Sequence, residues 1–305
     1  MIKTEVYEQV LFETVKRGAT ELSADVQEAF EAAILRESNP DAKNGLIATL
    51  KSMKMSAQRE NPLCVDTGWP IFYFKVGNQC QLEGGFVELE NAARRAVAKA
   101  TKMGYLRATM KHPLTGFDPG NNIGMNIPDF TYKFVDGDAI EISYAAKGGG
   151  SECFGGTRHR IVAFADGIQG IEKFVIDSFT ASARAGAVCP PSVLGIGIGG
   201  TANVAANLAK EAACLRTVGS RHPDPMFTKI EEDLYKALNS LGFGILGAGG
   251  DTSVLGVNVE YAYTHIAGIA VATSTNCMVA RRASSRIDGD SRVTVMKSPM
   301  WFGDR

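Results

Sequence analysis

The sequence has no excess of charge of one sign, no long apolar run and no closely spaced cysteine pair. Its 305 residues carry 32 Lys and Arg against 33 Asp and Glu, a net charge of −1. This balance argues against a general nucleic-acid-binding protein, which needs surplus cations to neutralise phosphates. No apolar run approaches the ~18 residues of a membrane span, and residues 1–18 alternate charged and apolar side chains, unlike a signal peptide. We expect a cytoplasmic protein that binds neither membrane nor nucleic acid.

Three familiar motifs are also missing. None of the six cysteines forms a C-x-x-C pair, so a zinc ribbon or a redox dithiol is disfavoured. Residues 195–200 read GxGxGG instead of the dinucleotide-binding GxGxxG, and no Walker A lysine pattern occurs. In a reducing compartment the cysteines are better interpreted as buried thiols, catalytic thiols or metal ligands than as disulfides.

The apolar spacing predicts an α+β fold. Helical periodicity runs through residues 1–57, and mixed strand and helix patterns follow over residues 58–305. We predict a helical N-terminal region, 1–57, continuous with a catalytic body, 58–305, in one compact body with room for two lobes. No repeat or low-complexity linker marks an internal boundary.

Individual elements follow from local patterns. Helices are expected over 87–103, 203–215 and 227–241. Strands are expected at 71–76, 130–135, 140–145 and 171–175, after Pro191, and at 252–263. Asp136-Gly137-Asp138 is a typical hairpin turn between two of these strands. The polar segment 284–305 is expected to wrap the surface.

Glycine is abundant, at 33 residues, and gathers beside reactive side chains. Four such segments occur, at 64–68, 147–153, 189–200 and 247–252. Successive glycines let backbone N–H groups converge on an anion, so a small carboxylate or phosphate ligand is favoured over tight turns alone. Cys80 and Cys214 lie outside these segments and are expected to be core residues. The residues alone indicate a thiol or metal enzyme that acts on an anion.

Five motifs in order resemble the class I fumarase and tartrate dehydratase family of iron–sulfur hydro-lyases. They are Cys64-x-Asp-Thr-Gly68, Lys147-Gly-Gly-Gly-Ser151, Cys189-Pro-Pro, Thr264-His265 and Asn276-Cys277-x-x-x-Arg-Arg282. The match covers about residues 60–285, and the Asn122 to Pro128 and Gly219 to Pro225 stretches are closer to the tartrate dehydratase α subunit.

The resemblance implies a central [4Fe–4S] cluster held by Cys64, Cys189 and Cys277. Three thiolates leave one iron open, and an open iron can act as a Lewis acid. The implied activity is the reversible dehydration of a small hydroxy carboxylic acid of the L-tartrate or malate/fumarate type. Two alternatives stay open: a thiol or zinc hydrolase that uses Cys189 or Cys153 with His159, and a non-catalytic iron–sulfur sensing subunit.

The resemblance also implies roles for other residues. Asp66 matches the acid/base residue beside the cluster, and His265 matches a histidine that contacts the substrate. The substrate-binding set implied by motif position is Arg107, Gly149, Gly150, Lys147, Val65 and Cys153. Val65 and Cys153 replace amides that are common in the family. Two interpretations stay open: a native substrate that is less polar on one side, or a Cys153 side chain that only fills space.

A separate β subunit is also expected. Single-chain class I fumarases continue with a further domain, whereas only 23 residues follow Arg282 here. No unassigned motif supplies the base that removes a proton from carbon. The resemblance therefore implies a β subunit that completes the active site and an α dimer, which together give an α2β2 assembly.

Overall fold

The computed structural model describes residues 1–186 and 188–303. These residues divide into two compact units, which are described separately. The first unit consists of Met1–Ser23, Met53–Lys147 and Arg281–Trp301. The second consists mainly of Ala24–Ser52 and Gly148–Ala280. Both units combine helices with a mixed sheet, so the α+β class is confirmed.

The first 57 residues are helical, as the periodicity predicts. The helices are α1 (Thr4–Thr20), α2 (Ala24–Arg36) and α3 (Pro40–Gln58). The Asn39 carboxamide oxygen accepts a hydrogen bond from the Asp41 N–H at 2.9 Å and so starts α3. Helix α1 belongs to the first unit and α2 to the second. The division into 1–57 and 58–305 stays a prediction.

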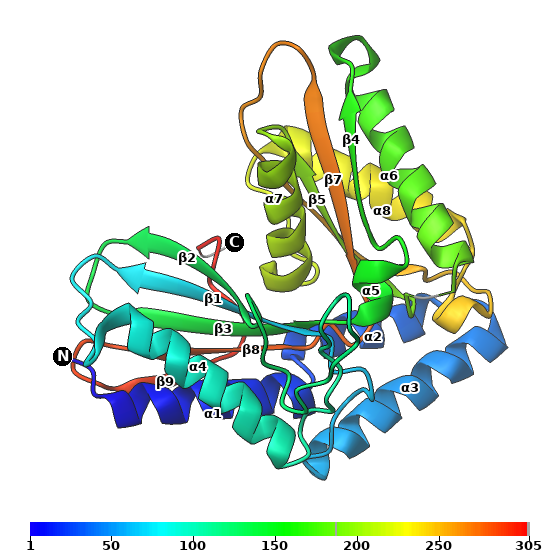
Figure 1. Cartoon of the computed structure of the whole chain (residues 1–305). Helices are drawn as coiled ribbons and strands as arrows, with labels where there is room; N and C mark the ends of the chain where they lie inside the picture. The colour runs from blue at the N-terminus through cyan, green and yellow to red at the C-terminus, as the bar shows by residue number, and fades with distance from the viewer. Residues whose placement is uncertain (187, 304–305) are drawn as a thin grey trace. The chain divides into compact units, whose positions relative to one another are not determined.

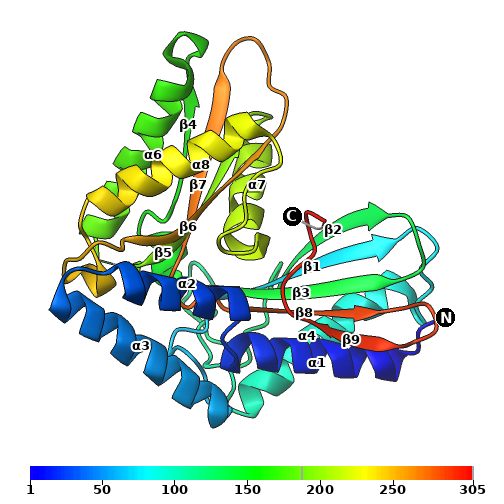
Figure 2. The ribbon, with the colours of Figure 1, turned by 180° about the vertical axis from the view of Figure 1, so that it is seen from behind.

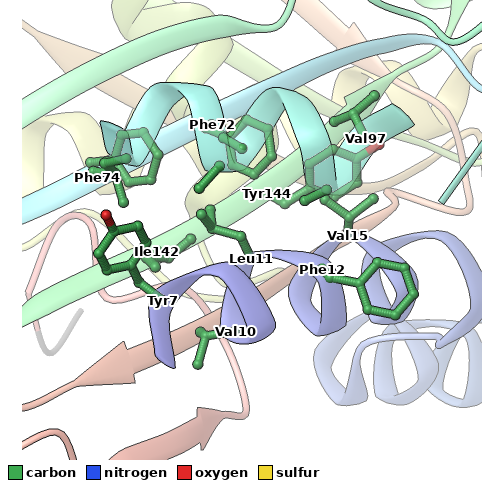
Figure 3. Packing of buried hydrophobic residues seen from close by; sticks show 14 of the residues in the cluster. Tyr7, Val10, Leu11, Phe12, Val15, Phe72, Phe74, Val97, Ile142 and Tyr144 are labelled. Carbon is green, nitrogen blue, oxygen red and sulfur yellow. The ribbon is translucent and has the colours of Figure 1, made fainter. Parts of the chain in front are cut away.

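The first unit is built on a five-stranded sheet in the order β2-β1-β3-β8-β9. Its strands are β1 (Trp69–Gly77), β2 (Asp129–Val135), β3 (Ile140–Lys147), β8 (Arg282–Ile287) and β9 (Val293–Met296). Helices α1 and α4 (Gly85–Lys102) cover one face of this sheet (Figure 1). Large buried side chains, such as Leu11, Phe72, Phe74 and Tyr144, fill the space between these helices and the sheet (Figure 3).

The predicted hairpin around Asp136-Gly137-Asp138 is wrong, although both of its strands exist. Strand β1 lies between β2 and β3, parallel to β2 and antiparallel to β3. The Asp136-Gly137-Asp138 turn instead packs on the residues after β1, where Asn78 N donates to Val135 O at 2.7 Å. The apolar runs identify strands, but they do not specify which strands are neighbours.

The expected surface position of the C-terminal segment is wrong for its first part. Strand β8 lies inside the sheet, paired with β3 and β9, and Ser284 and Ser285 are buried. Their hydroxyl groups are paired with Ser143 at 2.7 Å and with Thr14 at 2.8 Å. Such pairs let polar residues occupy the interior. Residues 304–305 of the segment lie outside the described residues.

The second unit contains a four-stranded sheet in the order β4-β7-β5-β6. Its strands are β4 (Thr157–Val162), β5 (Ser192–Ile198), β6 (Val254–Tyr261) and β7 (Ile269–Asn276). Its other helices are α5 (Gly149–Cys153), α6 (Gly167–Arg184), α7 (Ala202–Leu215) and α8 (Pro225–Ser240), with 3₁₀ turns at Phe164–Asp166 and Ile245–Gly247. Helix α7 covers one face of the sheet, and α6 and α8 cover the other (Figures 1 and 2).

The strand predicted at residues 171–175 is wrong, because these residues belong to α6. Ile171, Phe174, Val175 and Phe179 are buried with the helical spacing of i, i+3, i+4 and i+8. A short apolar run fits a strand and one face of a helix equally well, and packing against the sheet decides. The expected helices around α4, α7 and α8 are confirmed.

Among residues 1–186 and 188–303, no helix combines the length and the apolar character needed to cross a membrane.

Candidate active site

In the first unit, the loop before β1 carries Cys64, Val65 and Asp66. The N–H of Leu63 donates to the Ala19 carbonyl at 2.9 Å and fixes this loop to the end of α1. Cys64 and Asp66 are partly exposed, and Val65 is 78% exposed. The Asp66 carboxylate accepts the Gly68 N–H at 3.1 Å, which sets the turn.

Thr67 fixes Arg107 to the same loop. Its hydroxyl donates to the Arg107 carbonyl and accepts from the Arg107 N–H, both at 2.7 Å. Thr67 is buried, whereas Arg107 is exposed. The structure therefore brings Asp66 and Arg107, two predicted site residues 41 positions apart, into one neighbourhood.

Asn122 completes this arrangement. It is fully buried, its amide nitrogen donates to the Arg107 carbonyl at 3.0 Å, and its oxygen accepts from the Thr109 N–H at 2.8 Å. Thr67 and Asn122 are positioning residues that the sequence analysis missed. Thr67 stands inside a quoted motif, but no pattern in the sequence links it to position 107.

In the second unit, Cys189 and Cys277 lie at the same end of the sheet. Cys189 precedes β5 and Cys277 follows β7, and these antiparallel strands pair Val193 with Asn276. The N–H of Met278 donates to the Cys189 carbonyl at 3.0 Å, so the two backbones are in direct contact. Cys189 is exposed and Cys277 is partly exposed. This end of the sheet therefore presents two accessible thiols.

Helix α5, with Gly149, Gly150 and Cys153, lies at that same end. The loop that follows α5 is fixed to β7, because the Thr275 N–H donates to the Gly156 carbonyl at 2.6 Å. Figure 1 shows α5 beside the end of β7 that leads to Cys277. Cys153 is exposed. Lys147, the last residue of β3 in the first unit, is buried.

His265 lies at the opposite end of the second unit's sheet. It precedes β7, whereas Cys277 follows it, and the eight residues of this strand span ~23 Å at ~3.3 Å per residue. His265 is exposed, and its Nδ1 accepts the Ala267 N–H at 3.1 Å. The second unit therefore does not bring His265 together with Cys189 and Cys277.

The two remaining glycine-rich segments have structural explanations. In β5, Gly195 and Gly197 face α7, where a Cβ on Gly197 would lie 2.0 Å from the Ala205 carbonyl oxygen. In the segment 247–252, both carboxylate oxygens of Glu37 accept the Asp251 N–H at 3.0 Å. One segment packs a helix, and the other binds a carboxylate of the chain itself.

The six cysteines differ in how exposed their thiols are. All six are described, and each is a thiol and not half of a disulfide. Cys214 is buried, and burial raises the pKa of the half-buried Cys80 thiol, as expected for core residues.

Within residues 1–186 and 188–303, no group of three or more His, Cys, Asp or Glu that could hold a metal ion occurs. Cys64 belongs to one unit and Cys189 and Cys277 to the other.

Comparison with known proteins gives one consistent result. A family model described as "Fumarate hydratase (Fumerase)" matches residues 8–286. A Methanocaldococcus jannaschii protein with the provisional name L(+)-tartrate dehydratase subunit alpha is 37% identical over 93% of this chain and 98% of its own. The L(+)-tartrate dehydratase subunit alpha of Escherichia coli strain UTI89 is 36% identical, and that of strain K12 is 35% identical. Each of these two alignments covers 78% of this chain and 77% of the relative.

Proposed function

Because this chain belongs to the fumarate hydratase family, we propose that it is the α subunit of a [4Fe–4S]-dependent hydro-lyase. Membership of this family establishes a hydro-lyase and displaces the hydrolase alternative built on His159. The proposed substrate is a small hydroxy carboxylic acid of the L-tartrate or malate/fumarate type. L(+)-tartrate is the substrate in the names of the relatives.

The proximity of Cys189 and Cys277 is the observation that supports the cofactor. Two accessible thiols at one end of a sheet, joined through the Met278 N–H, suit soft iron, which thiolates bind well. We assign the third ligand to Cys64, whose loop is anchored at Leu63. When bound, a cluster with three thiolate ligands keeps one iron open as a Lewis acid for the leaving hydroxyl group.

The chain's own residues supply binding and proton transfer. The exposed Arg107 guanidinium suits a bidentate pair with a substrate carboxylate. Thr67 and Asn122 fix the Arg107 backbone beside the Asp66 loop, so Asp66 can exchange a proton with the substrate hydroxyl group. We assign the N–H groups of Gly149 and Gly150 to the stabilisation of developing carboxylate charge.

Three further residues refine the site. The Lys147 ammonium adds positive charge before the Gly149–Gly150 pair. Val65 and Cys153 stand where amides are common in the family, and both are exposed. A substrate group opposite them receives fewer hydrogen bonds, so we propose a substrate that is less polar on that side than a fully hydroxylated dicarboxylate.

We further propose that a separate β subunit completes the site and that the whole assembly is α2β2. The relatives are named as α subunits, which supports a partner chain. Dehydration also needs a base that removes a proton from a carbon atom of the substrate. None of the residues assigned above has this role. Closure of the site by the β subunit would exclude water.

The first test measures iron. After anaerobic reconstitution, Cys64→Ser, Cys189→Ser and Cys277→Ser should each lose the bound iron and sulfide, because a serine alkoxide is a poor ligand for a cluster iron. Cys80→Ser and Cys214→Ser are the matched controls and should keep both. Iron loss from a control but not from Cys189→Ser would contradict the ligand assignment. A cluster without turnover on any hydroxy acid, with the β subunit present, would instead support the sensing alternative.

The second test concerns proton transfer. Asp66→Asn should keep the cluster and its iron content but lower kcat by ~10²–10⁴-fold, because proton transfer contributes about that much. The amide still accepts the Gly68 N–H, so the turn is preserved. A near-normal kcat with a panel of hydroxy acids would show that Asp66 only shapes the turn.

A further inference from the structure

Arg281 belongs to the last of the five motifs, but the proposed function gives it no role. It is only 3% exposed, and within residues 1–186 and 188–303 its guanidinium has neither a hydrogen-bond partner at Nε nor an ion pair with a carboxylate. Arg216 is equally buried, but its guanidinium lies 2.8 Å from a carboxylate oxygen of Glu260. A buried charge without a partner is strongly unfavourable. Arg281 therefore needs an anion that the described part of the chain does not supply.

Arg281 lies on the face of the first sheet that α1 and α4 cover. It directly precedes β8, and its carbonyl accepts the Ala146 N–H at 3.1 Å, which continues the pairing of β8 with β3. Side chains alternate along a strand, so Arg281 shares a face with Ala283, which pairs with the buried Tyr144 (Figure 3). Burial raises the pKa of Tyr144 to about 12, and the nearby positive charge of Arg281 opposes this rise. The charge of Arg281 is thus placed inside this unit.

The loop that carries Cys64 leaves the sheet at the same end. We call residues 63–68 the Cys64 loop, which leads directly into β1. Ala146 lies beside Arg281 on one side and pairs with Pro70, near the start of β1, on the other. These three residues form one row across three strands, which spans ~10 Å at ~4.8 Å between neighbouring strands. Arg281 therefore lies at the end of the sheet from which the Cys64 loop extends.

The C-terminal end of α1 connects Arg281 with this loop. The Leu63 N–H donates to the Ala19 carbonyl at 2.9 Å. The preceding residue, Gly18, packs against the strand that follows Arg281, because a Cβ on Gly18 would lie 3.4 Å from the Ala283 nitrogen. The end of a helix carries about half a negative charge, which favours a cation but does not replace a full anion. The missing anion is therefore expected beside the Cys64 loop.

We propose that Arg281 is the buried countercharge of the iron–sulfur cluster, a positioning residue that favours retention of the cluster and raises its reduction potential. The inference rests on the proposed function, which assigns Cys64 as a cluster ligand. Three thiolate ligands give such a cluster a net negative charge, and nearby charges set its potential. A substrate carboxylate is better served by Arg107, which is exposed, whereas Arg281 is closed to solvent.

The stability of the cluster-free chain tests whether Arg281 lacks a partner. The full chain, freed of its cluster with a chelator, is unfolded in urea as the wild type and as Arg281→Met, in which an apolar side chain replaces the cation. The variant should have the higher urea midpoint, because it removes an uncompensated buried charge. A lower midpoint, or a variant that fails to fold, would show that the chain itself compensates Arg281 and would overturn the proposal.

Arg286→Met is the matched control for this measurement. Arg286 lies on the same strand, but it is paired with Glu141 at 3.1 Å and with Asp288 at 2.8 Å. Its removal deletes a compensated charge, so the urea midpoint of the cluster-free chain should not rise. An equal rise in both variants would show that methionine stabilises this strand at any position and would remove the support for an unpaired Arg281.

The reduction potential of the reconstituted cluster tests the contact without turnover. In an anaerobic redox titration followed by EPR, Arg281→Met should have a lower potential than the wild type, because loss of a nearby positive charge disfavours the added electron. Arg281→Lys keeps the charge and should stay close to the wild type, as should Arg286→Met. Release of iron to a chelator should be about 10- to 100-fold faster in Arg281→Met, as for a lost interaction with a charged group.

The outcomes separate this inference from the function on which it rests. An unchanged potential and iron release in Arg281→Met, at wild-type iron and sulfide content, would overturn the inference and leave the hydro-lyase intact. The same unchanged cluster with a KM for the hydroxy acid raised about 10- to 100-fold would assign Arg281 to a substrate carboxylate instead. A wild type that binds no iron and sulfide would reject the proposed function and this inference with it, while the urea midpoints would still report whether Arg281 is uncompensated.

Discussion

The two sheets of this protein meet their helices in opposite ways. In the first unit, large rings from β1 and β3, such as Phe72 and Tyr144, fill the space under α1 and α4 (Figure 3). In the second unit, Gly195 and Gly197 of β5 let α7 approach closely, with alanines on the facing side. Packing with large side chains keeps the helices away from the sheet, whereas packing on glycine brings the backbones together. A run of glycines near a reactive cysteine is thus not by itself a ligand loop.

Two buried polar groups, one from each unit, differ in charge. Between β3 and β8, the first unit buries a neutral hydroxyl pair, Ser143 with Ser284. The second unit buries a cluster of opposite charges: Arg216 lies 2.8 Å from Glu260 and 3.4 Å from Glu231, and all three are buried. The stability of the second unit should therefore depend on pH at this cluster, whereas the hydroxyl pairs do not titrate.

The largest effect on stability is expected where the backbone of β5 contacts the backbone of α7. Gly197→Ala should lower the free energy of unfolding by ~1–3 kcal/mol, because the new Cβ would lie 2.0 Å from the Ala205 carbonyl oxygen and α7 would have to shift. Gly124→Ala is the control, since no atom lies within 4 Å of its Cβ. It should change stability by less than ~0.5 kcal/mol in urea denaturation. Equal effects would show that α7 adjusts freely and that close packing is not the reason for glycine.

The sequence predicts most elements of this fold because their signals are local. Helix α8 is an example: its apolar spacing predicts the helix, and Asp224 before Pro225 starts it, accepting the Met226 N–H at 2.9 Å. Strand order is not a local property. The position of β1 between β2 and β3 depends on contacts between distant residues, and so does the burial of β8.

The candidate site shows the same limit. Its residues are found by type and motif, but their grouping depends on contacts that the sequence does not display. Thr67, Arg107 and Asn122 meet through hydrogen bonds across 55 positions of the chain. Conversely, His265 and Cys277 are only 12 positions apart, yet a whole strand separates them.

A smaller effect is expected from the charge cluster of the second unit. Burial raises the pKa of Glu231, and the Val259 N–H and Arg216 only partly oppose this. A raised pKa in the folded state means that the folded protein binds the proton more tightly than the unfolded chain. Stability from this group is therefore fully present below the unfolded pKa of ~4.3 and is lost as pH rises through the folded value.

The variant Glu231→Gln checks this sign. The measured quantity is the unfolding free energy of the wild type minus that of the variant. This difference should increase as the pH falls from 7 toward 4, because only the wild type gains the proton. The glutamine oxygen can still accept the Val259 N–H, bonded to Glu231 at 2.9 Å, but the glutamine NH2 cannot accept the His222 N–H, bonded to Glu231 at 3.0 Å. This loss lowers the stability of the variant by an amount that does not depend on pH, so the change of the difference with pH still reports the pKa. Urea denaturation at several pH values measures the difference. A difference that is constant over this range would contradict the raised pKa.

The smallest effect is expected from the hydroxyl pair of the first unit. Ser143 and Ser284 face each other across β3 and β8, with their oxygens 2.7 Å apart. Ser284→Ala should cost ~1 kcal/mol, because it leaves the buried Ser143 hydroxyl without this partner, whereas replacing both serines by alanine should be nearly neutral. A double-mutant cycle in urea isolates the coupling, which should not change between pH 5 and 8 because neither hydroxyl titrates there. A coupling that changes with pH would show that a titrating group takes part. A double variant as unstable as the sum of the two single variants would show that the two hydroxyl groups do not stabilise each other.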